Sequence, residues 1–379
     1  MGKDIYSNKL VKIFKFGFIL FVKCLSVFVP VKANRVTLIR THASGSNVTP
    51  LYKELKKNKK LDLELIDHEP YDFSQNLIVR EVKLLLKLLR SKVIVTTHGP
   101  ILTTRKNIVI ELWHGTGFKN IGFTDSINSL DPLSLKIRKY NYSNIDLLVS
   151  SSKEDKKRKR DSFLCENVRI TGSPRNDVFF NSSLLKVDYI KKLDLGKFDK
   201  INLYAPTFRD SNFKTPFDEN FFEKLNELMS SKNEVFLVKK HPADQDLKIP
   251  KKYSNIIDVT TQVEDVQDLL VVTDVLITDY SGIVTDFVLT NRPVIFFMYD
   301  YETYTKKSRN FYYDLQEIFP PSIIKSNTQL LNYLEDLSWS KKKNYIKKYE
   351  EFKNRFHYYK DGNSTQRVVK LILELKNGK

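Results

Sequence analysis

Residues Val275 to Asp300 read VLITDYSGIVTDFVLTNRPVIFFMYD, and this stretch decides the fold. Val275 to Thr278 is an apolar run that ends in the turn-forming residues DYSG. Ile283 to Leu289 has helical spacing, and Val294 to Met298 is a second apolar run. The pattern predicts a strand, a tight turn, a helix and another strand, which is the repeating unit of a parallel α/β sheet.

The turn between the first strand and the helix carries polar and small residues. Ligands of open α/β sheets bind beyond the carboxyl ends of the strands, where a helix amino terminus offers N–H groups to a phosphate. Thr278 and Ser281 bring hydroxyl groups to this turn, and Gly282 lets a ligand approach the backbone. Asp279 or Ser281 could equally be the N-cap of an ordinary helix. This stretch alone leaves both interpretations open.

Length and composition favour two α/β domains. The chain has 379 residues, of which 41% are hydrophobic and 12% aromatic, so a globally disordered chain is excluded. The net charge of +18 indicates anionic partners, such as nucleic acid, a membrane surface or phosphorylated substrates, unless it reflects a lysine-rich surface alone. The two cysteines, Cys24 and Cys165, predict neither a disulfide framework nor a zinc site and fit a reducing compartment.

The stretch Lys9 to Val29 is apolar but interrupted by lysines. Its longest charge-free run, Phe16 to Val22, is far shorter than the ~20 residues of a spanning helix. A signal peptide is disfavoured because no small-residue cleavage site precedes Pro30. We expect an in-plane helix on an anionic membrane surface, the alternative being a helix docked on the protein's own core. Four lysines share one third of its helical wheel: Lys9, Lys12, Lys15 and Lys23.

Strands and helices alternate along the rest of the chain, as in doubly wound parallel sheets. A polar, irregular stretch at 178–200 separates two such sets. The predicted strands are Val36–Arg40, Leu61–Asp67, Val93–Thr97, Ile108–His114, Leu147–Ser150 and Val168–Thr171, then Ile201–Ala205, Val235–Lys239, Ile256–Val259, Val275–Thr278 and Val294–Met298.

Two histidines end predicted strands. His114 lies in ELWHGTGFK, where the neighbouring glycines let the backbone turn tightly. An imidazole there suits a general base, although a lone histidine is more often bonded to a carbonyl at the edge of a core. His241 follows Lys239 in VKKHP and suits a phosphate or a leaving group, although alone it is better explained as a strand cap.

Two further polar turns follow strands. Thr207 and Arg209 lie in YAPTFRD, where arginine suits bidentate phosphate binding and a salt bridge to Asp210 is the alternative. The turn TGSPRND projects polar residues or simply starts a helix. No cysteine or histidine set has metal-ligand spacing, and DxD, Walker, GxGxxG and GxSxG motifs are absent. No predicted strand interleaves aromatic and basic residues, which argues against RNA-binding modules.

Five segments resemble the CDP-glycerol glycerophosphotransferase family, the wall teichoic acid primases and polymerases of Gram-positive bacteria. They are LWHGTGFKNIGF, TGSPRNDVFF, LYAPTFRD, VKKHP and DVLITDYSGIVTDFVLTNRPVIFF, and they occur in the family's order. The resemblance runs from about Val93 to Arg367. One departure is Gly282, where the family's TDYSS motif has a second serine.

The resemblance implies a GT-B fold, with two Rossmann-like domains facing across a cleft and the amino-terminal amphipathic helix added. The expected parts are a membrane-surface helix at 1–32, an acceptor-side domain at 33–190, a CDP-donor domain at 191–335, and carboxyl-terminal helices at 336–379 that pack back on the first domain. The implied catalytic residues are His114 and His241. The implied substrate-binding residues are Gly115, Thr116, Arg175, Asn176, Asp177, Thr207, Arg209, Lys239, Thr278, Asp279, Ser281, Gly282 and Asp286.

The implied reaction transfers glycerol phosphate from CDP-glycerol to an undecaprenyl-diphosphate-linked acceptor at the cytoplasmic face of the membrane and releases CMP. No cofactor, metal or nucleic-acid partner is expected. CDP-ribitol or another CDP-polyol is the alternative donor. A remote alternative is a non-enzymatic basic protein that binds lipid or nucleic acid.

Overall fold

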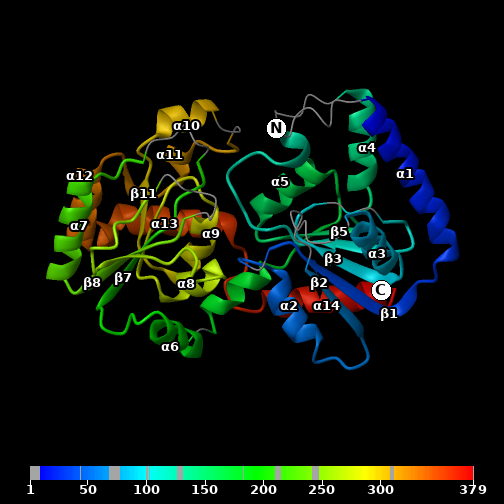
Figure 1. Cartoon of the computed structure of the whole chain (residues 1–379), viewed down its shortest axis with the longest axis horizontal. Coiled ribbons are helices and arrows are strands. Elements are labelled where there is room, and N and C mark those ends of the chain that lie inside the picture. Colours follow the sequence, from blue (N-terminus) through cyan, green and yellow to red (C-terminus); the bar gives the residue numbers. More distant parts are fainter. Residues whose placement is uncertain are drawn as a thin grey trace. The chain divides into compact units, whose positions relative to one another are not determined.

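In the computed structural model, the chain divides into two compact units, each built on a six-stranded sheet (Figure 1). Unit 1 comprises the chain up to His114, Ile121–Asp177 and the residues from Asn363 onward, and unit 2 comprises Gly115–Asn120 and Val178–Gly362. The structure describes residues 9–42, 44–67, 77–99, 101, 103–125, 131–181, 183–209, 215–240, 247–307 and 311–378. Within these ranges, it does not describe the side chains of 9–16, 77–81, 183–185 and 306–307.

Unit 1 is a parallel sheet with strand order β2-β1-β3-β4-β5-β6. Its central strands β3, β4 and β5 are short, mostly buried apolar runs, as expected where helices cover both faces, whereas the edge strand β2 is half-buried. They are β1 (Lys32–Arg40), β2 (Asp62–Asp67), β3 (Ser91–Thr96), β4 (Ile108–Glu111), β5 (Leu147–Ser150) and β6 (Val168–Ile170). The helices are α1 (Lys9–Phe28), α2 (Val48–Leu55), α3 (Leu77–Leu89), α4 (Pro132–Tyr142), α5 (Lys153–Phe163) and α14 (Ser364–Lys376), with a 3-10 turn at Gly122–Thr124.

The last helix of the chain completes the core of unit 1. Val368 and Ile372 of α14 are fully buried in one cluster with Leu51 and Leu55 of α2. Figure 1 shows the two helices side by side, although they come from opposite ends of the sequence. Tertiary packing therefore holds the two chain ends of this unit together.

Unit 2 is a second parallel sheet, with strand order β12-β11-β10-β7-β8-β9. Its strands are β7 (Lys200–Tyr204), β8 (Glu234–Val238), β9 (Ile256–Asp258), β10 (Val275–Thr278), β11 (Val294–Phe297) and β12 (Ile323–Ile324). The helices are α6 (Ser183–Lys192), α7 (Glu219–Ser231), α8 (Val266–Val272), α9 (Ile283–Phe287), α10 (Tyr301–Lys307), α11 (Leu315–Ile318), α12 (Asn327–Glu335) and α13 (Lys343–Phe356). The 3-10 segments are Pro174–Phe179, Val288–Thr290 and Leu337–Lys341.

The predicted strands are present, with three differences from the expected layout. The strand expected over Ile108–His114 stops at Glu111, because Trp113 has a φ of 61° that no extended strand allows. The short strand β12 was not predicted. The units divide after Asp177 rather than at 190, and α13 remains in unit 2, because its Tyr349 and Phe356 are buried in that core.

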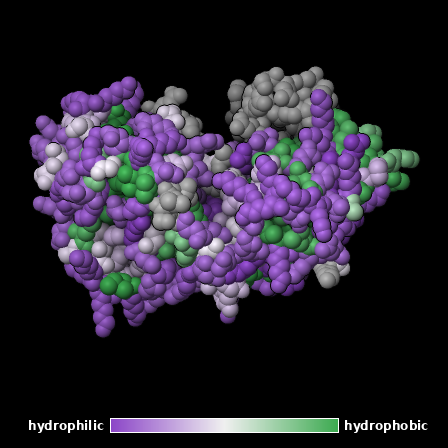
Figure 2. Space-filling view, turned by 90° about the horizontal axis from the view of Figure 1, so that it is seen from below, coloured by the Kyte–Doolittle hydropathy of each residue, from purple (hydrophilic) through white to green (hydrophobic). Residues whose placement is uncertain are grey.

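Helix α1 forms where the lysine-interrupted stretch predicted a helix. Ile19 and Val22 are buried, and Val22 packs with Leu85 and Leu89 of α3. Other apolar residues of α1 are exposed, and Figure 2 shows hydrophobic atoms gathered at the edge of unit 1 where α1 lies in Figure 1. In the part of the chain that the structure describes, no helix has the length and apolar character needed to cross a membrane. The exposed residues are Phe18, Leu20, Phe21, Val27 and Phe28.

Candidate functional site

The strand order of unit 2 creates a topological switch point between β7 and β10. From β7 the chain continues to β8 on one side, whereas β10 leads to β11 on the other. The loops after these two neighbouring strands therefore lead to opposite sides of the sheet, and α/β sheets bind ligands at such positions. Thr207 follows β7 and Asp279 follows β10. The stretch from Val275 to Asp300 thus supplies one side of this switch point.

Asp279 joins the two loops. Its carboxylate is fully buried and accepts hydrogen bonds from the Thr207 N–H at 2.9 Å and the Thr207 hydroxyl at 2.7 Å. It also accepts from the Tyr280 N–H at 2.6 Å and pairs with the Arg209 guanidinium at 2.7 Å. A buried carboxylate with this many donors is well compensated for the water it lost. Asp279 therefore fixes the shape of the turn and is not directed at solvent.

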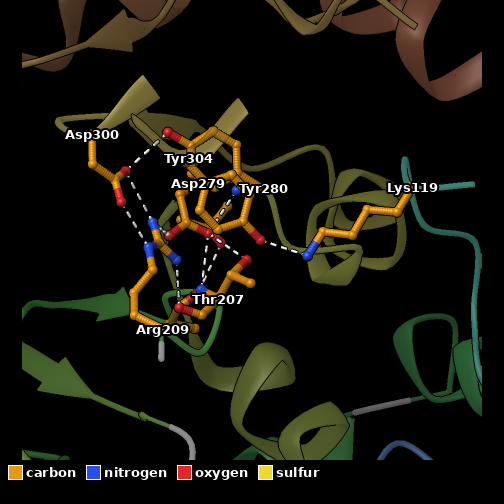
Figure 3. A network of polar contacts seen from close by, with 9 residues as sticks. Lys119, Thr207, Arg209, Asp279, Tyr280, Asp300 and Tyr304 are labelled. Carbon is orange, nitrogen blue, oxygen red and sulfur yellow. Dashed lines mark hydrogen bonds and ion pairs between the residues drawn. The ribbon is translucent and has the colours of Figure 1, made fainter. Parts of the chain in front are cut away.

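Arg209 is held between two carboxylates (Figure 3). Its Nε donates to Asp300 at 2.8 Å, its NH2 nitrogen donates to Asp279, and its NH1 nitrogen donates to the Thr207 carbonyl at 2.5 Å. The salt bridge to Asp210, the alternative raised by the sequence, involves a residue outside the described ranges. A phosphate would have to compete with two buried carboxylates for this guanidinium. Arg209 therefore positions the turn, and its expected direct contact with a phosphate stays a prediction.

Aromatic rings and a lysine cover the Arg209 guanidinium. Tyr280 and Tyr304 stack with their ring centroids 3.9 Å apart, and Arg209 lies 4.6 Å from the Tyr304 ring centroid. The Tyr280 hydroxyl donates to Asp300 at 3.0 Å, and Lys119 Nζ donates to the Tyr304 hydroxyl at 2.5 Å (Figure 3). Cation–π contacts in such a sheltered place add to the ion pairs. The turn after β10 is thus supported on several sides before any ligand binds.

The remaining residues of the turn differ in how far the fold uses their side chains. The Thr278 hydroxyl donates to the Ala205 carbonyl at 2.7 Å, and Asp286 accepts from the Gln267 side chain at 3.1 Å, so these two residues serve the fold. The Ser281 hydroxyl accepts from the Ile283 N–H at 3.3 Å, but the N-cap of α9 is Gly282, so neither Asp279 nor Ser281 is the cap that the sequence suggested. Ser281 and Gly282 are half-buried, so they are the members of the turn that a ligand could reach.

The segment Gly115–Asn120 packs against this turn. The Thr116 carbonyl accepts a hydrogen bond from the Thr285 hydroxyl at 3.0 Å, and Phe118 is buried in the core of unit 2. A Cβ atom on Gly282 would lie 3.0 Å from the Thr116 carbonyl oxygen, closer than such contacts normally are. The departure from the family motif at Gly282 therefore allows the close approach of this segment.

The structure describes one of the two residues expected to act in the VKKHP motif, Lys239, but not the other, His241. Lys239 Nζ donates to the Thr260 carbonyl at 2.8 Å and the Val263 carbonyl at 2.7 Å, so it ties down the loop after β9. Burial lowers the pKa of Lys239, and the charge of Asp258 opposes that shift. His241 lies outside the described residues, so its part in the site stays a prediction.

In unit 1, a strained turn precedes the predicted base. Trp113 has a φ of 61°, which bulky residues rarely adopt. Its N–H donates to the buried Glu111 carboxyl at 2.7 Å, and its carbonyl accepts from the Asn47 side chain at 2.8 Å. Glu111 also accepts from the Gly99 N–H at 3.1 Å, so one carboxyl ties the loops after β3 and β4 together. These bonds compensate for the strain and fix the place of His114.

His114 lies at the carboxyl edge of the unit 1 sheet. Its ring stacks on His98 with a centroid separation of 4.8 Å, and it bonds to the Thr97 backbone carbonyl. The carbonyl requires an N–H on one ring nitrogen, which leaves the other nitrogen to accept a proton. His114 keeps more than a third of its surface exposed. Even so, burial of its ring, followed by the charges of His98 and Arg175, lowers its pKa to about 3. The imidazole is therefore neutral at pH 7, the form that a general base requires.

The TGSPRND turn is mainly structural. Arg175 donates to the carbonyls of Gly45 at 2.9 Å and His114 at 2.5 Å. Asp177 accepts from the N–H groups of Ser364 at 2.9 Å and Thr365 at 2.7 Å at the start of α14. Asn176 is buried within this turn. Asp177 therefore holds the start of α14, and Arg175 is bonded to the backbone of the predicted base. The substrate-binding roles expected of these residues stay predictions.

The described residues contain no group of three histidine, cysteine, aspartate or glutamate side chains that could hold a metal ion. The sequence profile of the CDP-Glycerol:Poly(glycerophosphate) glycerophosphotransferases matches residues 21–374. The chain belongs to this family.

Curated relatives of this glycerophosphotransferase family member come from teichoic acid synthesis. The teichoic acid poly(ribitol-phosphate) polymerase of Bacillus spizizenii is 30% identical over 98% of this chain, which spans 61% of the polymerase. The teichoic acid ribitol-phosphate polymerase TarK of Staphylococcus aureus is 32% identical over 69% of this chain and 51% of its own length. The teichoic acid glycerol-phosphate primase of Bacillus subtilis is 31% identical over 78% of this chain and 76% of the primase. The chain thus spans about half to three fifths of the two polymerases.

Solved structures give the same fold for this family member. The wall teichoic acid polymerase TagF matches with a TM-score of 0.77 at 21% identity, over 98% of this chain and 99% of that one. A TagF variant soaked with CDPG also matches with a TM-score of 0.77, at 20% identity. This likeness confirms the predicted α/β fold class of the GT-B type.

The sequence did not reveal several residues of this glycerophosphotransferase family member. These residues shape the Asp279 turn of unit 2 and the surroundings of His114 in unit 1. Glu111 stands inside the quoted ELWHG motif, but only its burial under two N–H groups reveals its part. Others had no usable local signal, because their partners are far away in the sequence. They are Asn47, Asp300, Tyr304 and Lys119.

Proposed function

We propose that this chain transfers glycerol phosphate from CDP-glycerol to a hydroxyl of a lipid-linked acceptor and releases CMP, as a step of wall teichoic acid synthesis. The observation that carries the proposal is the turn Asp279–Gly282, held against Thr207 at the switch point of unit 2 in a chain of this family. A preorganised polar turn at a strand end suits a diphosphate. The shared family supplies the donor class.

In the proposed reaction, the acceptor hydroxyl oxygen attacks the β-phosphorus of CDP-glycerol. A new P–O bond forms, the bond from that phosphorus to the bridging oxygen breaks, and CMP leaves with the electron pair. His114 takes the hydroxyl proton on the ring nitrogen that does not face the Thr97 carbonyl. Negative charge grows on the departing CMP, and fixed donors stabilise it without reorganising.

The donor side of the proposed site is the turn itself. The half-buried residues Ser281 and Gly282 are its proposed contacts with the diphosphate, and His241 remains the proposed partner of that group. Arg209 and Asp300 act from behind the turn through Asp279. The chain passes from His114 directly into Gly115–Asn120, the segment that contacts this turn through Thr116.

CDP-ribitol is the alternative donor. It is favoured by the names of three relatives, which are ribitol-phosphate polymerases of Bacillus spizizenii and Staphylococcus aureus. The glycerol-phosphate primase of Bacillus subtilis, at 31% identity, favours glycerol. The same residues would perform either transfer, because the two donors share the cytidine diphosphate.

We further propose that α1 docks on the anionic cytoplasmic face of the cell membrane, where an undecaprenyl-diphosphate-linked acceptor is held. Val22 anchors the helix to unit 1, whereas Phe21 is 57% exposed, Val27 67% and Phe28 82%. Exposed aromatic and aliphatic side chains next to lysines are typical of helices that lie in the interface. The net charge of +18 fits the same surface.

The test measures CMP release from CDP-glycerol and from CDP-ribitol with a lipid-linked acceptor. We expect turnover with one of them, and a loss of at least about 100-fold in His114→Asn with CDP-glycerol binding retained, because asparagine cannot take the proton. Isothermal titration with CDP-glycerol serves as the folding and binding control. No turnover of the wild-type chain with either donor would refute the proposed activity, and full activity of His114→Asn would refute the base.

A further inference from the structure

The unit 1 sheet also has a topological switch point, and two histidines flank it. The strand β1 is hydrogen-bonded to both β2 and β3, so the chain leaves β1 toward one side and reaches β3 on the other. His42 follows β1 and His98 follows β3, and the next strand, β4, leads to His114. The ligand-binding position of an α/β sheet is therefore lined here by imidazoles.

The three rings form one continuous group. The centroids of His42 and His98 are 5.1 Å apart in an edge-to-face arrangement, and those of His98 and His114 are 4.8 Å apart with only 15° between their planes. All three residues are exposed. Nδ1 of His98 lies 2.8 Å from the Thr97 hydroxyl, so Nε2 is the nitrogen that a ligand can engage. The group thus presents ring N–H donors to solvent beside the proposed base.

In the described part of the chain, the groups that shift the pKa values of His98 and His114 include no carboxylate. Burial and then repulsion from His42 lower the pKa of His98 to about 4, and Arg175 and Lys159 act on His114 in the same direction. The acid of this group is Glu111, and burial raises its pKa to about 8, so it is mostly neutral at pH 7. An anionic ligand would supply the missing negative charge and make protonated imidazoles favourable.

We propose that His42 and His98 form a subsite for a phosphate group of the acceptor, beside the base His114. This deepens the proposed function and rests on it. In a polyol phosphate acceptor, one polyol unit separates the phosphate from the attacking hydroxyl. The ring centroids of His98 and His114 are 4.8 Å apart, a separation that one polyol unit can span. The phosphate belongs either to a polyol phosphate terminus or to the diphosphate of the lipid carrier. The donor diphosphate is assigned to the turn of unit 2.

The test follows the six histidines by NMR after selective 13C labelling of their ring carbons, in the full chain. Histidine-to-asparagine variants assign the signals, and pH titrations are recorded with glycerol 3-phosphate, with isopentenyl diphosphate, with CDP-glycerol and with uncharged glycerol. With a phosphate compound we expect the pKa of His98 to rise by about one to three units, and the ring signals of His42 to move on binding. Glycerol should cause no change. A larger effect of glycerol 3-phosphate identifies the polyol phosphate as the source, and a larger effect of isopentenyl diphosphate identifies the carrier.

Affinity measurements give a second readout. We expect His98→Asn to bind the effective phosphate compound about tenfold or more weakly, because one hydrogen bond to a charged group is lost. His42→Asn should show a smaller loss in the same direction. The control is Lys60→Ala, which removes an exposed positive charge elsewhere in unit 1 and should bind as the wild type does.

Three results would overturn the subsite. One is an unchanged pKa of His98 with both phosphate compounds, the second is a shift with CDP-glycerol alone, and the third is an equal affinity loss in Lys60→Ala and His98→Asn. None of these measurements needs turnover. A response of His98 in a chain that never releases CMP would therefore refute the proposed activity but keep the phosphate site, and turnover without a response would do the reverse.

Discussion

The buried carboxyl of Glu111 predicts an unusual dependence of stability on pH. Glu111 is fully buried and accepts hydrogen bonds from the N–H groups of Trp113 and Gly99. Burial raises its pKa from 4.5 to about 8, and the two hydrogen bonds and Lys159 only partly oppose this shift. The substitution Glu111→Gln keeps the size of the side chain and one acceptor oxygen, and it removes the titration.

The sign and size of the expected change in unfolding free energy follow from the linkage between protonation and folding. A group whose folded pKa is raised stabilises the protein fully below its unfolded pKa and loses that contribution as the pH rises toward its folded pKa. Between pH 5 and pH 7, the carboxyl ionises in the unfolded chain but stays protonated in the folded one, which costs the wild type roughly 2–3 kcal/mol. The Glu111→Gln variant does not lose this stability between pH 5 and pH 7, because glutamine does not titrate. Its amide NH2 group faces an N–H, which costs about 1–3 kcal/mol at every pH.

The assay is urea unfolding between pH 4 and pH 7, followed by the fluorescence of Trp113. The chain has two tryptophans, so the background substitution Trp339→Phe leaves a reporter in unit 1. We expect the stability of Glu111→Gln relative to the wild type to increase with pH by roughly 2–3 kcal/mol.

The matched control is Glu54→Gln in the same unit. Hydrogen bonds from Lys57 and Gln366 lower the pKa of Glu54, so its ionised form stabilises the fold above pH 4.5 and the loss occurs as the pH falls. The control should therefore change in the opposite direction. Parallel curves for the wild type and Glu111→Gln would refute the reasoning.

Three further predictions concern the turn of unit 2 and the helix α1. Gly282→Ser should lower the unfolding free energy by about 1 kcal/mol, because the new Cβ crowds the Thr116 carbonyl, and an unchanged or raised melting temperature would contradict this. Asp300→Asn should cost about 3 kcal/mol, since it leaves a buried guanidinium with one carboxylate, and equal urea midpoints of the two proteins would exclude that role. Phe21→Asp and Phe28→Asp together should weaken sedimentation with anionic liposomes, and unchanged sedimentation would place the membrane contact elsewhere.

Much of the layout was predictable because it is local. Runs of four to seven residues bounded by turn residues predicted all the strands of both sheets except β12, and helical spacing predicted α9 and α13. The motifs at strand ends drew attention to Asp279 and His114 because ligands gather there in parallel sheets. Arg209 and Asp177 also have bonds that serve the fold, because a polar residue at a strand end can do both, and their expected binding roles stay predictions.

The sequence by itself therefore determined two parallel α/β sheets, the family and the residues at the ends of the strands. Tertiary structure decided which strands are neighbours. Thr207 and Asp279 are 72 positions apart in the sequence and are bonded because β7 and β10 are paired. Arg209 and Asp300 are bonded although 91 positions separate them. Pairing and ion-pair partners depend on long-range packing, which no local window of sequence contains. The turn Asp279–Gly282 is consequently held in place by segments that only folding brings together.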